Sequence, residues 1–177
     1  MIKSIVDLKE YLQADLLANK FERMKFRWMN DRYNLLRALR KYEYAINTKM
    51  PPPIRLYYRY KLYNLSVKTG IQIPPNTFGK GLYIPHHGTI VVNETARFGD
   101  NCVIQAGVNI SEGVVGGEHI YLSAGCKIMK GVHISNNVII GANAVVTKDV
   151  DVENAVMAGV PAKMISQNGF GNRNTPI

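Results

Sequence analysis

The chain has 177 residues, 46% of them hydrophobic, and its 22 basic and 13 acidic residues give a net charge of +9. This length excludes a large multidomain protein and allows one compact domain with a modest appendage. Residues 1–70 hold 15 basic and 6 acidic residues and 11 of the 16 aromatic residues, whereas residues 71–177 hold 7 basic and 7 acidic residues. We therefore expect two different modules, joined near Gly70.

The N-terminal stretch MIKSIVDLKEYLQADLL has acidic residues well before any apolar run approaches the roughly 20 residues of a membrane span. No secretory signal is therefore expected, and a cytoplasmic location is the default. Cys102 and Cys126 lie within strand-like apolar repeats, without the paired spacing of a zinc site. We expect both to be buried free thiols.

The first 50 residues predict two helices. Ser4 followed by Asp7 is the pattern of a capping box, and the apolar residues after it recur at the spacing of a helix over about 5–18. Asp31 is expected to cap a second helix, which should end before three consecutive prolines. The helices of this module are too few and too basic to form a core alone, so we expect them to pack on the second module or on a neighbouring subunit.

A third helix is expected over about 54–69, with Gly70 as its left-handed C-cap. Its predicted apolar side consists of Leu56, Tyr60, Tyr63 and Val67. The run RLYYRYKLYNLSVK within it allows two interpretations: contact with an anionic membrane surface, polyanionic saccharide or nucleic acid, or a helix with inward tyrosines and solvated cations. No nucleic-acid-binding signature accompanies the charge, so no nucleic-acid partner is expected.

From residue 90 onward the chain divides into ten consecutive hexads with small or aliphatic first positions and bulky third positions. The third positions are Val92, Phe98, Ile104, Ile110, Gly116, Leu122, Ile128, Ile134, Ile140 and Val146. A period of six fits neither an α-helix nor an ordinary antiparallel strand. It fits a triangular coil of short strands and tight turns, in which three hexads complete one turn and both positions point inward. Cys102 and Cys126 are then one coil plus one face apart, which argues against a disulfide.

This repeat resembles that of the hexapeptide-repeat acyltransferases, whose fold is a left-handed parallel β-helix. The resemblance covers about 71–165 and implies a mainly β fold in which this domain follows an α-helical segment at 1–70. It also implies a homotrimer or a dimer of trimers, with active sites between subunits. Residues 166–177 are polar and Gly-rich and are expected to form a flexible tail. Because the same β-helix serves proteins that transfer no acyl group, the fold alone does not fix the activity.

The register of the repeat slips by two residues around residues 86–89. Where the register breaks at a histidine, its side chain can point away from the face of the prism and into a cleft. The flanking sequence resembles the serine acetyltransferase branch, particularly the short forms encoded with polysaccharide-assembly genes. In that branch a Gly-x-Gly-Leu-x-Ile-x-His segment, matched at 79–86, precedes a Val-Val-x-Glu-Thr-Ala segment, matched at 91–96.

The resemblance implies that His86 is a general base, which removes a proton from an acceptor hydroxyl as that oxygen attacks the thioester carbonyl of acetyl-CoA. A neutral imidazole suits this step, because its ordinary pKa lies near neutral pH. Without the resemblance, a histidine in a repeat protein is more often a satisfied turn residue. His87 is the rival base, or else it lines the acceptor pocket.

The later repeats carry two further segments of the family, at 140–150 and 158–163. The resemblance implies that backbone atoms near Ala124 and Ala142 line the pantetheine groove of the coenzyme. It places Thr147, Lys148 and Lys163 near the phosphates, for which a lysine is a suitable mobile charge. The alternative is that both lysines only solubilise the end of the prism.

The acceptor is expected to differ from that of the serine enzymes. Pro85 and Gln72 stand where those enzymes have aspartates, and their loop with an arginine suited to a substrate carboxylate is absent. A free amino acid would bind poorly without those charges, so a saccharide hydroxyl is preferred over serine.

This fold is compatible with two other functions. A zinc-dependent carbonic anhydrase is disfavoured, because the four histidines lack the spacing of three convergent ligands, and no metal is expected. A catalytically inert binding or scaffold module stays open. His119, Glu112 and Glu118 receive no catalytic role.

Overall fold

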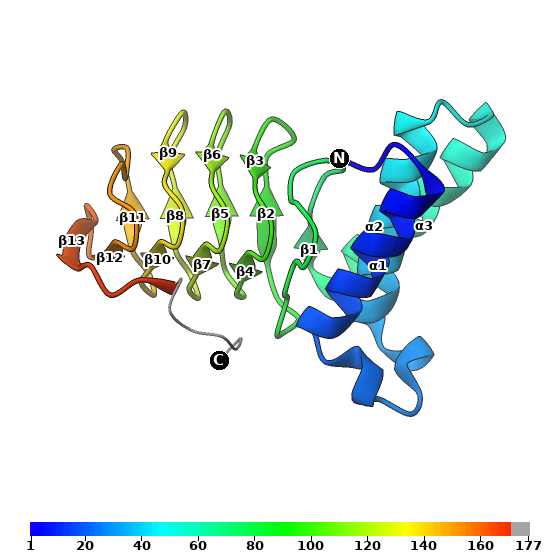
Figure 1. The fold of residues 1–177 in the computed structure, drawn as a ribbon, viewed down its shortest axis with the longest axis horizontal. Coiled ribbons are helices and arrows are strands. Elements are labelled where there is room, and N and C mark those ends of the chain that lie inside the picture. Colours follow the sequence, from blue (N-terminus) through cyan, green and yellow to red (C-terminus); the bar gives the residue numbers. More distant parts are fainter. Residues whose placement is uncertain (171–177) are drawn as a thin grey trace.

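The computed structural model describes residues 1–170 and places a cap of helices at one end of a prism of short strands (Figure 1). The cap contains α1 (Ile5–Ala18), α2 (Asp31–Asn47) and α3 (Pro52–Thr69). Two single-turn 3-10 helices, η1 (Phe21–Arg23) and η2 (Arg27–Met29), lie between α1 and α2. Among the described residues, no helix is both long and apolar enough to cross a bilayer.

The helix ends follow local capping chemistry. The Ser4 hydroxyl accepts from the Asp7 amide at 3.1 Å and the Asp7 carboxylate accepts from the Ser4 amide at 2.9 Å, which confirms the capping box. Asp31 was the wrong cap for α2, because Asn30 Oδ1 accepts the amides of the first turn and Asp31 is already helical. Gly70 is left-handed, with a φ of 71°, as predicted.

Helix α3 begins two residues earlier than expected, because prolines fit the first turn of a helix, where the amides have no intrahelical partner. Its predicted apolar side faces solvent in the single chain. Leu62 is buried and Leu65 packs against the core, and these two residues seat the helix. The exposed fractions on the opposite side are 65–67% for Leu56, Tyr60, Tyr63 and Val67.

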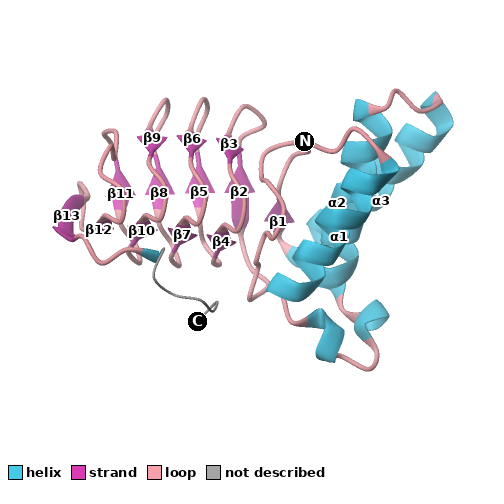
Figure 2. Ribbon diagram, in the orientation of Figure 1, coloured by secondary structure: helices cyan, strands magenta, loops and turns pink. Residues whose placement is uncertain are grey.

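The strands form three faces of a parallel β-helix, shown in magenta in Figure 2. One face contains β1 (Ile71–Gln72), β2 (Ile90–Val92), β5 (Asn109–Ile110), β8 (Lys127–Ile128) and β11 (Val145–Val146). The second contains β4 (Val103–Ile104), β7 (Tyr121–Leu122), β10 (Ile139–Ile140), β12 (Val156–Ala158) and β13 (Lys163–Ser166), and the third contains β3 (Arg97–Phe98), β6 (Val115–Gly116) and β9 (His133–Ile134). This is the left-handed β-helix with an N-terminal helical segment that the sequence predicts.

Strand partners in the regular coils are 18 residues apart, as for Val103 with Tyr121. The first and third positions of the hexads are buried and stack into one core. Gly116 is the exception that the packing requires, because a Cβ there would lie 2.3 Å from the ring of Phe98. That ring stacks on Phe78, with ring centroids 4.8 Å apart.

The helical cap and the prism share one hydrophobic core, which confirms that the helices pack on the second module. Apolar residues of α2, such as Leu36 and Leu39, belong to the same cluster as Ile71 and Ile84 of the first coil. The cap therefore covers one open end of the stack, which would otherwise expose apolar side chains and unpaired strand backbone.

The opposite end is closed by β13, which runs antiparallel to β12. The expected tail from residue 166 needs correction for residues 166–170, because Phe170 is buried and packs on Tyr121 with ring centroids 5.6 Å apart. Its amide also donates to the Asn137 carbonyl at 2.7 Å. Residues 171–177 of the expected tail lie outside the described residues.

Candidate functional site

The turn at residues 86–89 carries the two histidines singled out by the sequence. It leads from residues 82–84, which lie next to β4, into β2. The buried residues on its two sides, Ile84 and Val92, are eight residues apart instead of the six of a regular hexad. The predicted two-residue slip is thus confirmed as an enlarged corner of the prism. His86 and His87 are both exposed there.

Gly88 lets this corner lie close to the next coil. Its φ is 142°, and a Cβ at this position would lie 2.8 Å from the Cβ of Ala106. The Gly88 amide donates to the carbonyl of Thr69 at 3.2 Å, which ties the corner to the end of α3. The backbone around the histidines is therefore held by both the cap and the prism.

Arg32, in the first turn of α2, binds the backbone directly before His86. Its Nη1 donates to the carbonyl of Ile84 at 2.6 Å and to that of Pro85. The guanidinium lies over the Phe21 ring, 5.7 Å from the centroid, and burial lowers the pKa of Arg32 from its ordinary value. This contact was missed at the sequence level, because nothing distinguishes Arg32 from the many cations around it.

The C-terminal end of α1 binds the same stretch of chain from the other side. Asn19 Nδ2 donates to the Leu82 carbonyl at 2.8 Å, and Asn19 Oδ1 accepts from the Ile84 amide at 3.1 Å. Side chains at the end of α1 and in α2 therefore both bind backbone groups of residues 82–85. The cap thus fixes the position of the chain that leads into His86.

A buried ionic cluster lies beneath this contact. Arg40 donates to Asp15 at 2.7 Å, to Glu43 at 3.0 Å, and to the carbonyls of Phe78 and Gly79. Burial alone would lower the pKa of Arg40, but the two carboxylates outweigh it and raise the pKa above its ordinary value. The cluster joins α1 and α2 to the first coil of the prism.

Ala124 and Ala142 lie on the same edge of the prism as the histidine corner. A ladder of backbone hydrogen bonds follows this edge: Gly107 donates to Thr89 at 2.7 Å, Gly125 to Ala106 at 2.9 Å, and Asn143 to Ala124 at 2.9 Å. Because neighbouring strands are about 4.8 Å apart, Ala124 lies roughly 10 Å along the edge from the corner. Both alanines are exposed.

The structure separates the three proposed phosphate-binding residues. Lys163 pairs with Ala158, whose strand continues next to β10, so Lys163 lies toward the edge of Ala142. Thr147 and Lys148 follow β11, whereas Ala142 precedes it, so they lie on the neighbouring edge. A single chain therefore does not bring all five coenzyme candidates together.

The remaining histidines lie away from the corner. His119 has a positive φ of 53°, and its Nε2 lies 3.3 Å from Asn101 Nδ2, as in an ordinary turn. His133 Nδ1 lies 3.7 Å from the Asp149 carboxylate, with both side chains exposed. Within residues 1–170, no three His, Cys, Asp or Glu side chains gather as metal ligands would.

Neither cysteine is placed to act as a nucleophile. Cys102 and Cys126 are buried free thiols on different faces of the prism, as predicted. Burial raises the pKa of each thiol to about 12, so both are protonated near neutral pH.

Two open hollows lie on another part of the molecule. One of about 550 Å³ lies between α3 and β1, where Tyr63 and Gln72 are among its lining residues. One of about 490 Å³ follows the face of β2 and β5 and includes Glu94 and Glu112. His86 lines neither hollow, so neither identifies the acceptor site.

Known proteins share the repeat and the fold of this chain. A family model described as the hexapeptide repeat of succinyl-transferase matches residues 97–112 and 122–148. The chain is 26% identical to the serine acetyltransferase of Neisseria gonorrhoeae over 90% of its own length, with a TM-score of 0.72, and spans 66% of that enzyme. No curated protein sequence matches it.

Two further structures have the same fold. The serine acetyltransferase of Brucella abortus strain S19 is 24% identical, with a TM-score of 0.74 over 93% of this chain and 71% of that one. A serine acetyltransferase in complex with CoA is 22% identical, with a TM-score of 0.69 over 91% of this chain and 71% of that one. The helical cap and the prism therefore occur together in other proteins.

Proposed function

We propose that this chain, which is similar in its repeat and fold to hexapeptide-repeat serine acetyltransferases, transfers an acetyl group from acetyl-CoA to a hydroxyl group. The observation that carries this proposal is the enlarged corner with His86, which lies on the same edge as Ala124 and Ala142. The similarity to a serine acetyltransferase in complex with CoA supports acetyl-CoA as the donor.

In this mechanism His86 acts as a general base. An exposed imidazole can accept a proton from the acceptor hydroxyl, and the freed oxygen then attacks the thioester carbonyl. The thiolate of CoA leaves and takes up a proton, so no acetylated enzyme forms. His87, on the same corner, lines the acceptor pocket.

The coenzyme is bound along the edge that starts at this corner. Backbone atoms near Ala124 and Ala142 line the groove for the pantetheine arm, and Thr147, Lys148 and Lys163 bind the phosphates. Because Lys148 lies on the next edge of the same chain, we propose a homotrimer, single or doubled, whose neighbouring subunits bring these edges together.

The proposed acceptor is a hydroxyl of a sugar or polysaccharide precursor. Pro85, directly before His86, and Gln72, in β1, stand where the serine enzymes have aspartates, so the chain lacks two carboxylates that would hold a substrate ammonium group. Serine is the second candidate, because the similar structures are serine acetyltransferases. We infer that the reaction takes place in the cytoplasm, where acetyl-CoA is available. The basic residues of 1–70 favour an acceptor near an anionic membrane or glycan.

A CoA-release assay tests the function. Acetyl-CoA is offered with L-serine and, separately, with capsule or lipopolysaccharide sugars. Turnover of a sugar supports the proposal, and efficient turnover of serine alone rejects the saccharide acceptor. Calorimetry with CoA distinguishes the sugar and serine acetyltransferase functions from an inert β-helix, because an inert scaffold would not bind the coenzyme.

A further inference from the structure

The connection between α1 and α2 presents a continuous exposed surface. All eight residues from Glu22 to Met29 are exposed, and four of them are large and apolar. Their exposed fractions are 41% for Met24, 58% for Phe26, 65% for Trp28 and 66% for Met29. We call residues 22–29 the anchor loop. Single exposed apolar residues are ordinary, but a gathered set of this kind marks an interaction site.

Cations alternate with these apolar side chains. Arg23, Lys25 and Arg27 lie within the anchor loop and Lys20 lies just before it, against a single acidic residue, Glu22. The ammonium group of Lys25 lies 5.6 Å from the centroid of the Phe26 ring. Aromatic and apolar side chains next to Lys and Arg are the composition of segments that lie in the headgroup region of an anionic bilayer.

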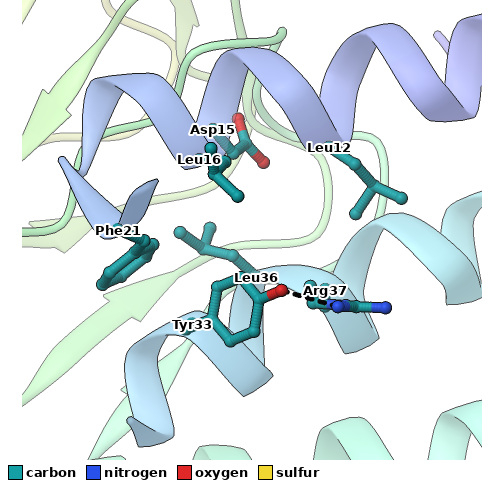
Figure 3. Close-up of a pocket in the computed structure, with 7 residues that line it drawn as sticks. All are labelled: Leu12, Asp15, Leu16, Phe21, Tyr33, Leu36 and Arg37. Carbon is teal, nitrogen blue, oxygen red and sulfur yellow. Dashed lines mark hydrogen bonds between the residues drawn. The ribbon is translucent and has the colours of Figure 1, made fainter. Parts of the chain in front are cut away.

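The residues beneath the loop are tightly packed. The exposed apolar side chains of the loop therefore have no empty site in the core to occupy. Phe21 is buried against Tyr33, edge to face, with ring centroids 5.4 Å apart, and Figure 3 shows both rings between α1 and α2. Arg37 Nη1 donates to the Tyr33 hydroxyl at 2.6 Å. The cavity among these side chains is about 10 Å³, which leaves room for no apolar side chain of the loop.

Both ends of the loop are attached to the chain that leads into the histidine corner. Asn19, three residues before the loop, binds the backbone of Leu82 and Ile84, and Arg32, three residues after it, binds the carbonyls of Ile84 and Pro85. Both flanks of the loop are therefore held against the residues that lead into His86.

We propose that the anchor loop binds the surface of an anionic lipid bilayer and so presents the histidine corner to an acceptor carried at that surface. The second half of this proposal rests on the proposed acetyl transfer, whereas lipid binding does not. Charge favours lipid headgroups as the occupant, because three cations of the loop alternate with its apolar side chains along the chain.

Trp28 is the only tryptophan of the chain, so its fluorescence reports on this loop alone. The full-length protein is titrated with vesicles of phosphatidylcholine and phosphatidylglycerol, and with vesicles of phosphatidylcholine only. We expect a blue shift of the emission and co-sedimentation with the anionic vesicles, both weakened by salt. An unchanged emission and no co-sedimentation with the anionic vesicles would overturn the proposal.

Two matched pairs of substitutions locate the contact. Lys25→Gln with Arg27→Gln removes two cations, which should weaken vesicle binding about 25-fold, at roughly fivefold per cation. Phe26→Ser with Met29→Ser should weaken it at least as much and keeps the reporter. Tyr60→Ser with Tyr63→Ser, two equally exposed residues of α3, is the control and should bind like the parent.

Equal losses in the control and loop variants would contradict the proposal. A Trp28 emission that is already blue-shifted without lipid and returns to the red on dilution would also contradict it, since the loop would then be an interface between copies of the chain. Acetyl transfer to a water-soluble acceptor is measured in parallel. Lipid binding without any acetyl transfer would reject the proposed function but would still support lipid binding by the anchor loop.

Discussion

Arg32 Nη1 lies 2.6 Å from the carbonyl oxygen of Ile84, two residues before His86. The same nitrogen also binds the carbonyl of Pro85, so one side chain of the cap fixes the two peptide groups that lead into the corner. We therefore regard Arg32 as a positioning residue. It touches the backbone that carries the proposed base and has no role of its own in the proposed reaction.

Replacing Arg32 with Met should lower kcat about 10- to 100-fold, because small displacements of a base from its productive geometry cost this much. The KM for acetyl-CoA should change little, since the proposed coenzyme groove begins farther along the edge. Arg37→Met is the control, because Arg37 binds Tyr33 and not the corner. Steady-state kinetics on folded variants decides. Equal losses in both variants would mean that Arg32 only stabilises the cap.

His86→Ala should reduce acetyl transfer at least about 100-fold, the usual scale of general-base catalysis, whereas His87→Ala should reduce it less. Both side chains are exposed, so neither change should affect folding. The measurement is the rate of CoA release by variants with the parent oligomeric state. Equal loss in the two variants would undo the assignment of His86 as the base.

Arg40→Met should destabilise the fold by about 3–5 kcal/mol, because it leaves the buried carboxylates of Asp15 and Glu43 without their counter-ion. Arg55→Met on the exposed side of α3 should change the free energy of unfolding by less than about 0.5 kcal/mol. Chemical denaturation of both variants measures the difference. If Arg40→Met unfolds with the parent's midpoint, the cluster contributes nothing to stability.

The hexad register predicted which residues of the prism are buried, because each coil must stack on the one before it and an inward position cannot change face without breaking the stack. The same reasoning located the corner at His86 as a break in that register. The β-helix and the exposed position of the histidines therefore follow from local spacing alone.

Contacts between distant segments were not predictable in this way. Asp15 and Arg40 are charged residues in amphipathic helices, where such residues normally face water, and only the folded cap brings them together. The apolar side of α3 was misplaced for the opposite reason. Spacing groups Tyr60 with Tyr63 but does not say that Leu62 seats the helix on the core.

The two thiols should be unreactive in the folded protein. Burial raises the pKa of Cys102 and Cys126 from about 9.0 to about 12, so the folded chain keeps both protons over a range in which the unfolded chain releases them. The free energy of unfolding is therefore unaffected by these thiols below about pH 9 and falls as the pH rises toward about 12. At pH 8, Ellman's reagent should label neither thiol in the folded protein and both in denaturant.

An exposed cysteine provides the control for this labelling. Lys130 is a solvent-exposed side chain, so Lys130→Cys should react at once in the folded protein, while the two native thiols still require unfolding. The labelling rate of the native thiols should fall when the protein is stabilised and rise in the Arg40→Met variant, because it follows the population of open molecules. Rapid labelling of either native thiol in the folded parent would show that its coil opens without global unfolding and that the prism is not closed there.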